Sequence, residues 1–162
     1  MKNFKLLLII TLLTFISCSS NDDMDTVPML QEVKATLDLA ALASITGNDA
    51  THLIKFNGVA ADQYTSVVIA GDQITYQIET NDPTTIVRIT KYEYTSGSMD
   101  LWKCLKPINT AGWQVGLMVN EDSTEVNLEC KFDIQFQLEV NGVLQTSKTY
   151  IIDPKIRIRA TR

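Results

Sequence analysis

The chain has 162 residues, of which 45% are hydrophobic and 20% charged, and its formal net charge at pH 7 is −5. This length and composition suit one globular domain with its own core. The excess of acidic side chains gives little electrostatic attraction to nucleic acid or anionic lipid, so nucleic acid is not expected as a partner.

Residues 1–17 have the features of an export signal. Lys2 and Lys5 make the start positive, and residues 6–16 form an apolar run. The run is shorter than the about 20 residues that a membrane-spanning helix needs, but it suits the apolar core of a secretory signal peptide. No later stretch of the sequence is apolar enough to span a bilayer.

A cysteine directly follows this run. Phe15, Ile16, Ser17 and Cys18 resemble the lipobox of bacterial lipoproteins, in which a small residue precedes a cysteine that is lipidated and becomes the first residue of the mature chain. The resemblance implies a lipid anchor on Cys18 and removal of residues 1–17, which changes the net charge from −5 to −7 because two lysines are lost. The alternative is an ordinary signal peptide with a chance cysteine.

The residues after the cysteine give a location. Residues 19–23 (SSNDD) resemble the Ser/Asp-rich tag that sends Bacteroidota-type lipoproteins to the cell surface. The resemblance implies a lipid-anchored outer-membrane protein displayed on the surface, and a plain acidic tether on the periplasmic side is the alternative. Residues 18–32, which are acidic and lack apolar periodicity, are expected to be a flexible tether, with the folded domain over residues 33–162.

The start of that domain is ambiguous. Residues 32–45 (EVKATLDLAALASI) are rich in Leu and Ala, as in a helix, but their apolar side chains also alternate with period two. Because strands are expected on both sides, a strand is favoured over a helix.

The strongest pattern lies in residues 126–140 (VNLECKFDIQFQLEV), where apolar and polar side chains alternate without a break. Period two over this length predicts a long strand with one buried face. Similar runs at 74–79 and 113–120 predict further strands, and a change of parity near Thr90 predicts a bulge or a strand with both faces covered. Turn-forming residues separate the runs.

About eight such strands predict an all-β fold, a two-sheet sandwich. Residues 70–82 (AGDQITYQIETND) look like the early strand of immunoglobulin-like repeats in bacterial surface proteins. This resemblance implies an immunoglobulin-like β-sandwich.

Asn141–Gly142 predicts a hairpin turn. A three-residue loop that pairs Glu139 with Val143 keeps the apolar faces of the two strands together, whereas a two-residue loop does not. The predicted register sets Cys130 against Ile152 and places Glu125 beside Arg157.

With Cys18 assigned to lipid, Cys104 and Cys130 remain, an even number in an exported protein. A disulfide between them is predicted, and two buried free thiols are the alternative.

The sequence shows no catalytic motif. Its one histidine, His52, is expected at a strand end on the surface, and no phosphate-binding loop or zinc motif occurs. No enzyme activity, cofactor or metal is expected, although a carboxylate-dependent hydrolase stays an alternative because sequence cannot place a pair of acids.

Four aromatic residues are the candidate ligand-stacking site: Tyr92, Tyr94, Trp102 and Trp113. Such flat side chains stack on sugar rings when they are exposed and grouped, and the alternative is that they belong to the core. The expected function is a non-catalytic binding or accessory module of the cell envelope, for a glycan or a partner protein. A structural or assembly lipoprotein without a small ligand is the alternative.

Overall fold

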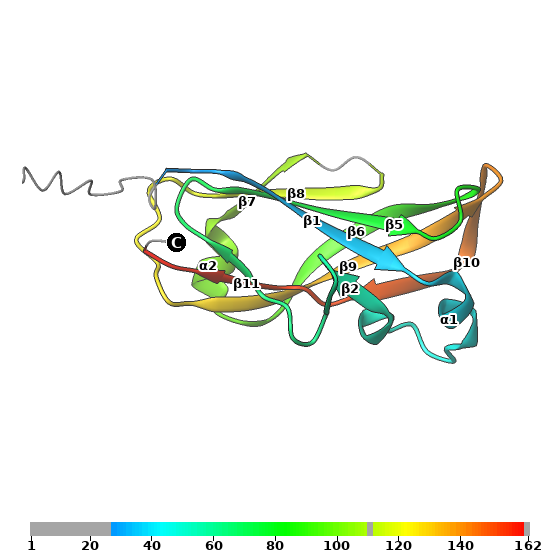
Figure 1. Cartoon of the computed structure of the whole chain (residues 1–162). Helices are drawn as coiled ribbons and strands as arrows, with labels where there is room; N and C mark the ends of the chain where they lie inside the picture. The colour runs from blue at the N-terminus through cyan, green and yellow to red at the C-terminus, as the bar shows by residue number, and fades with distance from the viewer. Residues whose placement is uncertain (1–26, 110–111, 161–162) are drawn as a thin grey trace, which may run out of the picture.

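The computed structural model describes residues 27–109 and 112–160 (Figure 1). Most of these residues form strands: β1 (Leu30–Leu37), β2 (Ile54–Phe56), β3 (Val59–Ala60), β4 (Ser66–Val68), β5 (Gln73–Thr80), β6 (Thr85–Gly97), β7 (Leu105–Asn109), β8 (Gln114–Val119), β9 (Glu129–Val140), β10 (Val143–Ile152) and β11 (Lys155–Ile158). Two short helices, α1 (Leu39–Ser44) and α2 (Met99–Cys104), and a 3-10 turn, η2 (Thr51–Leu53), accompany them. The predicted all-β class is confirmed.

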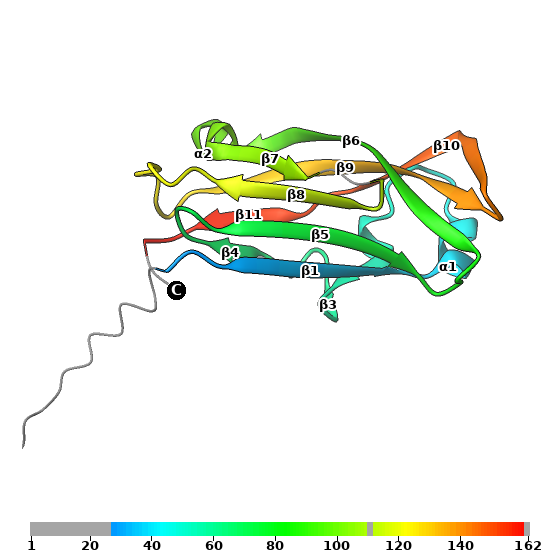
Figure 2. The ribbon, with the colours of Figure 1, turned by 90° about the horizontal axis from the view of Figure 1, so that it is seen from above.

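The strands form two sheets that face each other (Figure 2). The first has the order β3-β2-β1-β5-β8-β7. In the second, β9 pairs with β6 on one side and with β10 and β11 on the other, and β4 lies next to β11. Both sheets are mixed, because β1 runs parallel to β5 and β4 runs parallel to β11.

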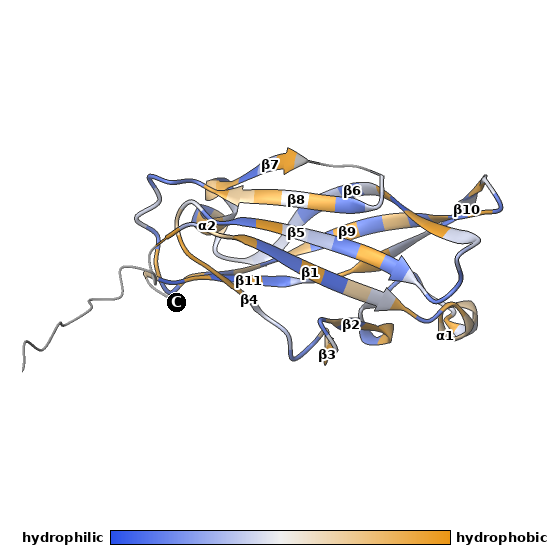
Figure 3. Cartoon of the chain, turned by 45° about the horizontal axis from the view of Figure 1, so that its top comes forward, coloured by the Kyte–Doolittle hydropathy of each residue, from blue (hydrophilic) through white to orange (hydrophobic). Residues whose placement is uncertain are grey.

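The core lies between the two sheets. Tyr76 of β5 and Phe132 of β9 are fully buried and meet edge to face, with ring centroids 5.5 Å apart. The Tyr76 hydroxyl shares a hydrogen bond of 2.7 Å with Ser66, so its burial leaves no polar atom without a partner. The alternation of apolar and polar residues along the strands is visible in Figure 3. This alternation places one face of each sheet in the core.

The segment 32–45 is a strand followed by a helix, so the favoured reading as one strand is wrong. β1 ends at Leu37, and the Asp38 carboxylate then accepts hydrogen bonds from the backbone N–H groups of Ala40 and Ala41, at 2.9 and 3.3 Å. This N-cap starts α1, whose leucines and alanines favour a helix. β1 also begins at Leu30, inside the range that was expected to be tether.

The hairpin turns at Asn141–Gly142 as predicted, but its register is different. Val140 pairs with Val143 across a two-residue loop, and both loop residues have positive φ, 50° and 79°, which fits a type I′ turn. A bulge between Gln145 and Tyr150 then shifts the register and sets Tyr150 opposite Phe136. The apolar faces therefore stay together by means of the bulge and not of a longer loop.

The pairing of the last strand, β11, with β9 also differs from the predicted register. Ile156 lies opposite Cys130, and the Arg157 guanidinium binds the Glu129 carboxylate at 2.7 Å, where Glu125 had been expected. In β6 the register shifts between Ile89 and Lys91, which confirms the bulge predicted near Thr90.

A buried aspartate fastens the start of β1 to the turn before β5. Asp72 is fully buried, and its carboxylate accepts hydrogen bonds from the backbone N–H of Met29 at 2.8 Å and of Ile69 at 3.0 Å. The Gln31 side-chain amide donates a third, at 3.0 Å. The segment that joins the tether is thus held by a carboxyl group that the core shields from solvent.

Candidate functional site

Three of the four candidate aromatic residues pack together on the inner face of the second sheet. Tyr92 and Tyr94 lie opposite the buried residues Ile134 and Phe132 of β9, so they point towards the core. Trp102 of α2 lies against both tyrosines, with ring centroids 6.3 and 6.2 Å away and planes inclined by 65° and 47°. Trp102 also packs on Phe132, at 5.6 Å.

This arrangement does not make the expected stacking platform. A sugar ring stacks on an exposed flat face, but these three rings are half-buried and inclined to one another. The Tyr94 hydroxyl also donates a hydrogen bond to the Gly97 carbonyl, at 2.8 Å. The cluster serves to pack α2 over the end of the core.

Trp113 lies apart from this cluster and is 41% exposed. It borders a hollow of about 320 Å³ at the corner where β5 ends and β6 begins. The hollow, called here the Trp113 groove, is lined by Ile78, Glu79, Thr80, Asp82, Pro83, Thr85, Ile86, Val87 and Trp113.

Backbone contacts hold Trp113 in place. The N–H of Ile78 in β5 donates to the Trp113 carbonyl at 3.4 Å, and the N–H of Ile89 in β6 donates to the Gly112 carbonyl at 2.5 Å. The two residues before β8 therefore contact a strand of each sheet. The groove is therefore formed jointly by β5, β6 and the two residues before β8.

The rim of the groove is negative. The Asp82 carboxylate accepts hydrogen bonds from the backbone N–H and hydroxyl of Thr84, at 2.9 and 2.8 Å, and from the Thr85 hydroxyl at 3.0 Å. These bonds, from Thr84 first, lower the pKa of Asp82, so that it is ionised at neutral pH. Glu79 on the same rim is exposed, and no lysine or arginine lines the groove among the described residues.

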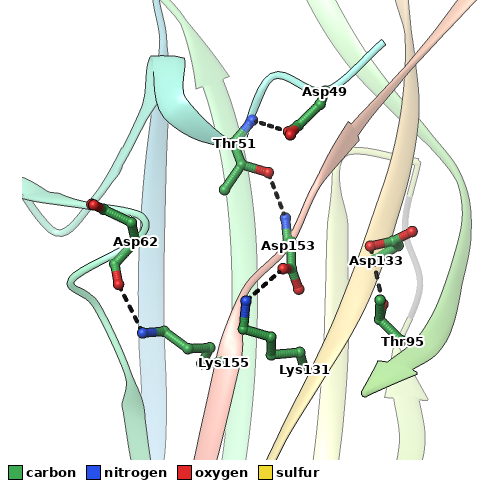
Figure 4. Close-up of polar contacts among 8 residues, drawn as sticks. All are labelled: Asp49, Thr51, Asp62, Thr95, Lys131, Asp133, Asp153 and Lys155. Carbon is green, nitrogen blue, oxygen red and sulfur yellow. Dashed lines mark hydrogen bonds and ion pairs between the residues drawn. The ribbon is translucent and has the colours of Figure 1, made fainter. Parts of the chain in front are cut away.

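A polar cluster lies on the outer face of the second sheet (Figure 4). The Lys131 ammonium contacts the Asp153 carboxylate at 3.0 Å, and the Asp153 backbone N–H donates to the Thr51 hydroxyl at 3.1 Å. Asp133, also in β9, accepts a hydrogen bond from the Thr95 hydroxyl at 3.1 Å. Acidic, basic and hydroxyl side chains from four segments thus share one surface.

Asp133 carries an unfavourable charge in this cluster. Burial raises its pKa, and the negative charges of Asp153, Glu93 and Asp49 raise it further, against the lowering effect of the Thr95 hydrogen bond. Because the folded pKa lies above the unfolded one, the contribution of Asp133 to stability is most favourable at low pH and weakens as the pH rises through the folded value.

Replacing this carboxylate by the neutral amide in Asp133→Asn is therefore expected to stabilise the fold at pH 7, by less than about 1 kcal/mol after solvent screening. The amide oxygen can still accept the Thr95 hydrogen bond. Urea unfolding at pH 4 and pH 7 measures the effect, which should shrink at the lower pH. Asp62→Asn at an exposed position is the control, and an equal gain in both variants would contradict the explanation.

Both remaining cysteines are free thiols, so the predicted disulfide is absent. Cys130 points into the core as expected and is fully buried, and burial raises the pKa of its thiol to about 12. Cys104 is half-buried at the end of α2, and its carbonyl accepts the N–H of Asn120. The even number of cysteines was a weak indicator, because it does not say where in the fold the two side chains lie.

His52 is exposed in the 3-10 turn, in agreement with its expected surface position. Over residues 27–109 and 112–160, no group of three or more His, Cys, Asp or Glu side chains has the geometry of a metal site. In the same part of the chain, no helix is long and apolar enough to cross a bilayer.

Comparison with known proteins shows the fold alone. No protein-family model and no curated protein sequence matches the chain. The crystal structure of the inclusion body protein PixA from Burkholderia cenocepacia is similar, with a TM-score of 0.59 and 7% identity over 84% of this chain and 98% of that one. The N-terminal domain of ORF48 of phage TP901-1 has a TM-score of 0.34 and 6% identity over 81% of this chain and 98% of that one, which is too low to carry an argument.

Proposed function

We propose that this chain is a lipid-anchored outer-membrane protein on the cell surface, whose β-sandwich is a non-catalytic module that binds a partner protein. The anchor rests on the resemblance of Phe15–Cys18 to a lipobox, which lies outside the described residues. The binding function rests on the Trp113 groove, an apolar hollow with a negative rim.

The chemistry of the groove favours a protein over a glycan. Ile86 and Trp113, both 41% exposed, offer apolar surface to aliphatic or aromatic side chains. Glu79 and Asp82 on the rim favour a positively charged neighbour, because complementary charges steer association and fix its register. The fitting ligand is an apolar segment of a partner protein flanked by lysine or arginine.

The position of the groove fits a domain that is displayed on the cell surface. β1 begins at the end of the sandwich where the described chain also finishes, and the groove lies towards the opposite end (Figures 1 and 2). Residues 18–26 reach at most about 30 Å, which keeps the first end close to the anchor. In this orientation the groove faces away from the membrane.

We also propose that the sandwich is a variant of the immunoglobulin-like class. Residues 70–82, which carry the resemblance, contain β5, a central strand of the first sheet. The parallel pairs β1–β5 and β4–β11 distinguish this variant from an arrangement of antiparallel strands alone.

A peptide-display selection on the full chain tests the groove. We expect it to enrich apolar segments flanked by lysine or arginine, and Trp113→Ala to weaken binding of the selected peptides at least about tenfold, as for a central aromatic contact. Glu79→Gln should weaken binding more at low salt than at high salt, because salt screens rim charges.

Ile108→Ala is the matched control. Ile108 is 42% exposed, close to the value for Trp113, but lies in β7 away from the groove. Binding that survives Trp113→Ala unchanged, or that falls equally in both variants, would show that the peptides bind elsewhere.

A further inference from the structure

The first half of β10 is an open sheet edge. Residues 143–147 are all exposed, and the exposed fractions of Val143 and Leu144 are 62% and 43%. Further along the strand, the N–H of Ala50 donates to the Ile151 carbonyl and the N–H of Ile151 donates to the Asn48 carbonyl. The edge is therefore covered at Ile151 and uncovered at Leu144.

The turn geometry determines which backbone groups this edge presents. In a two-residue hairpin the flanking pair, here Val140 and Val143, exchanges both hydrogen bonds, so the next pair, Glu139 and Leu144, points its N–H and C=O groups away from each other. Thr85 of β6 lies opposite Val140 on the other side of β9. Its N–H donates to the Asp82 carbonyl and not to β9, as this alternation requires. Leu144 thus presents one donor and one acceptor at the open edge.

The side chains at this edge are neutral. Residues 140–147 (VNGVLQTS) contain no ionisable side chain, in a chain of net charge −5. Glu139, the nearest acid in the same row of the sheet, is bound to Arg88 at 2.6 Å. Residues 143–147 also lack the lysine, proline or inward charge with which natural proteins protect an edge strand from pairing.

We propose that β10 is a self-association edge, at which a second copy of this chain adds its own β10 antiparallel, with Leu144 opposite Leu144 of the second copy. This pair exchanges both of the outward hydrogen bonds and brings two exposed leucine side chains side by side on one face. Across the junction the second sheet continues from one copy into the other.

A second copy fits this edge better than a foreign peptide. Two acidic molecules repel each other wherever their charged faces meet, and the uncharged strand is a place where they can approach without that cost. A two-fold axis through Leu144 needs only groups that each copy already presents. The proposal is independent of the lipid anchor and of the Trp113 groove.

Disulfide trapping in membranes that contain the full chain tests both the contact and its register. In a Cys104→Ser background, Leu144→Cys is expected to form a disulfide-linked dimer, because paired Cα atoms about 5.5 Å apart lie within disulfide range. Val143→Cys and Gln145→Cys chains, which lie opposite each other in this register, should link to each other when they are expressed together and much less to themselves. Ile108→Cys, equally exposed on β7, is the control.

A substitution that blocks strand pairing distinguishes specific association at this edge from random collision of two chains. Leu144→Pro removes the outward N–H without removing a hydrogen bond to β9, so it should reduce the Val143→Cys to Gln145→Cys product at least about tenfold while the melting temperature stays close to its value without proline. Equal dimer yield from Ile108→Cys, or an undiminished yield with proline in a folded chain, overturns the proposal. Linkage of Leu144→Cys to a different protein overturns it in favour of a foreign partner.

Discussion

Asp72→Ala is expected to lower the free energy of unfolding by about 3 kcal/mol. The Asp72 carboxylate is fully buried and accepts hydrogen bonds from the backbone N–H groups of Met29 and Ile69 and from the side-chain amide of Gln31. An alanine leaves these donors without their partner and opens a cavity in place of the carboxylate, and a buried donor without a partner costs about 1–3 kcal/mol. Urea unfolding followed by tryptophan fluorescence measures the loss.

Two further variants separate this cause from a general effect of losing an acid. Asp72→Asn keeps the shape and one acceptor oxygen, so it should lose less stability than Asp72→Ala. Asp122→Ala removes an exposed carboxylate from the nearby loop and should change stability by no more than about 0.5 kcal/mol. If Asp72→Ala is as mild as Asp122→Ala, the start of β1 is not held in the way described.

Nothing in the sequence predicted the role of Asp72. One of its donors, Met29, is 43 positions away in the chain and comes from the segment expected to be tether. Alternation, by contrast, predicted β9 well, because every second residue from Cys130 to Phe136 is buried in the core. A period of two is a local property, whereas the hydrogen-bond partners of a buried carboxyl group depend on how distant segments meet.

The two errors in secondary structure and pairing have local causes. The period-two pattern of residues 32–45 passes through Asp38 unchanged, but the carboxylate of that residue caps α1 and ends the strand. In β10 the bulge between Gln145 and Tyr150 restores the apolar face after a two-residue turn. A pattern of faces can identify which side chains must be inside, but a bulge and a longer loop satisfy it equally well.

The candidate site shows the same limit. Tyr92 and Tyr94 share one face of β6 because they are two residues apart, but parity does not distinguish the inner face of a sheet from the outer one. Trp113 was identified because flat aromatic side chains can stack on sugar rings, whereas Pro83 and Ile86 gave no signal of a binding site. Those two residues join Trp113 only because the turn between β5 and β6 passes from one sheet to the other.

Cys18→Ala is expected to release the protein from the membrane completely. In the proposed mature protein, the acyl chains on Cys18 are the whole attachment, and each buried methylene contributes about 0.8 kcal/mol, so several chains hold the protein far more firmly than any contact of the domain could. Alanine cannot be lipidated. Fractionation of cells of the native host should find the unchanged protein with the membrane and the variant in the soluble fraction or as uncleaved precursor.

Cys104→Ser is the matched control for this experiment, because it removes another free thiol, which lies in the folded domain, and should leave attachment unchanged. Mass spectrometry of the N-terminal peptide identifies the cause: the unchanged protein should begin at an acylated Cys18, and the Cys18→Ala variant should carry no acyl mass. Protease treatment of whole cells then distinguishes the two sides of the outer membrane, since a surface-exposed domain is removed and a periplasmic one is protected. A Cys18→Ala variant that stays with the membrane, or an unchanged protein whose Cys18 is unmodified, would show that the apolar run is an ordinary signal peptide and that the cysteine after it has no role in attachment.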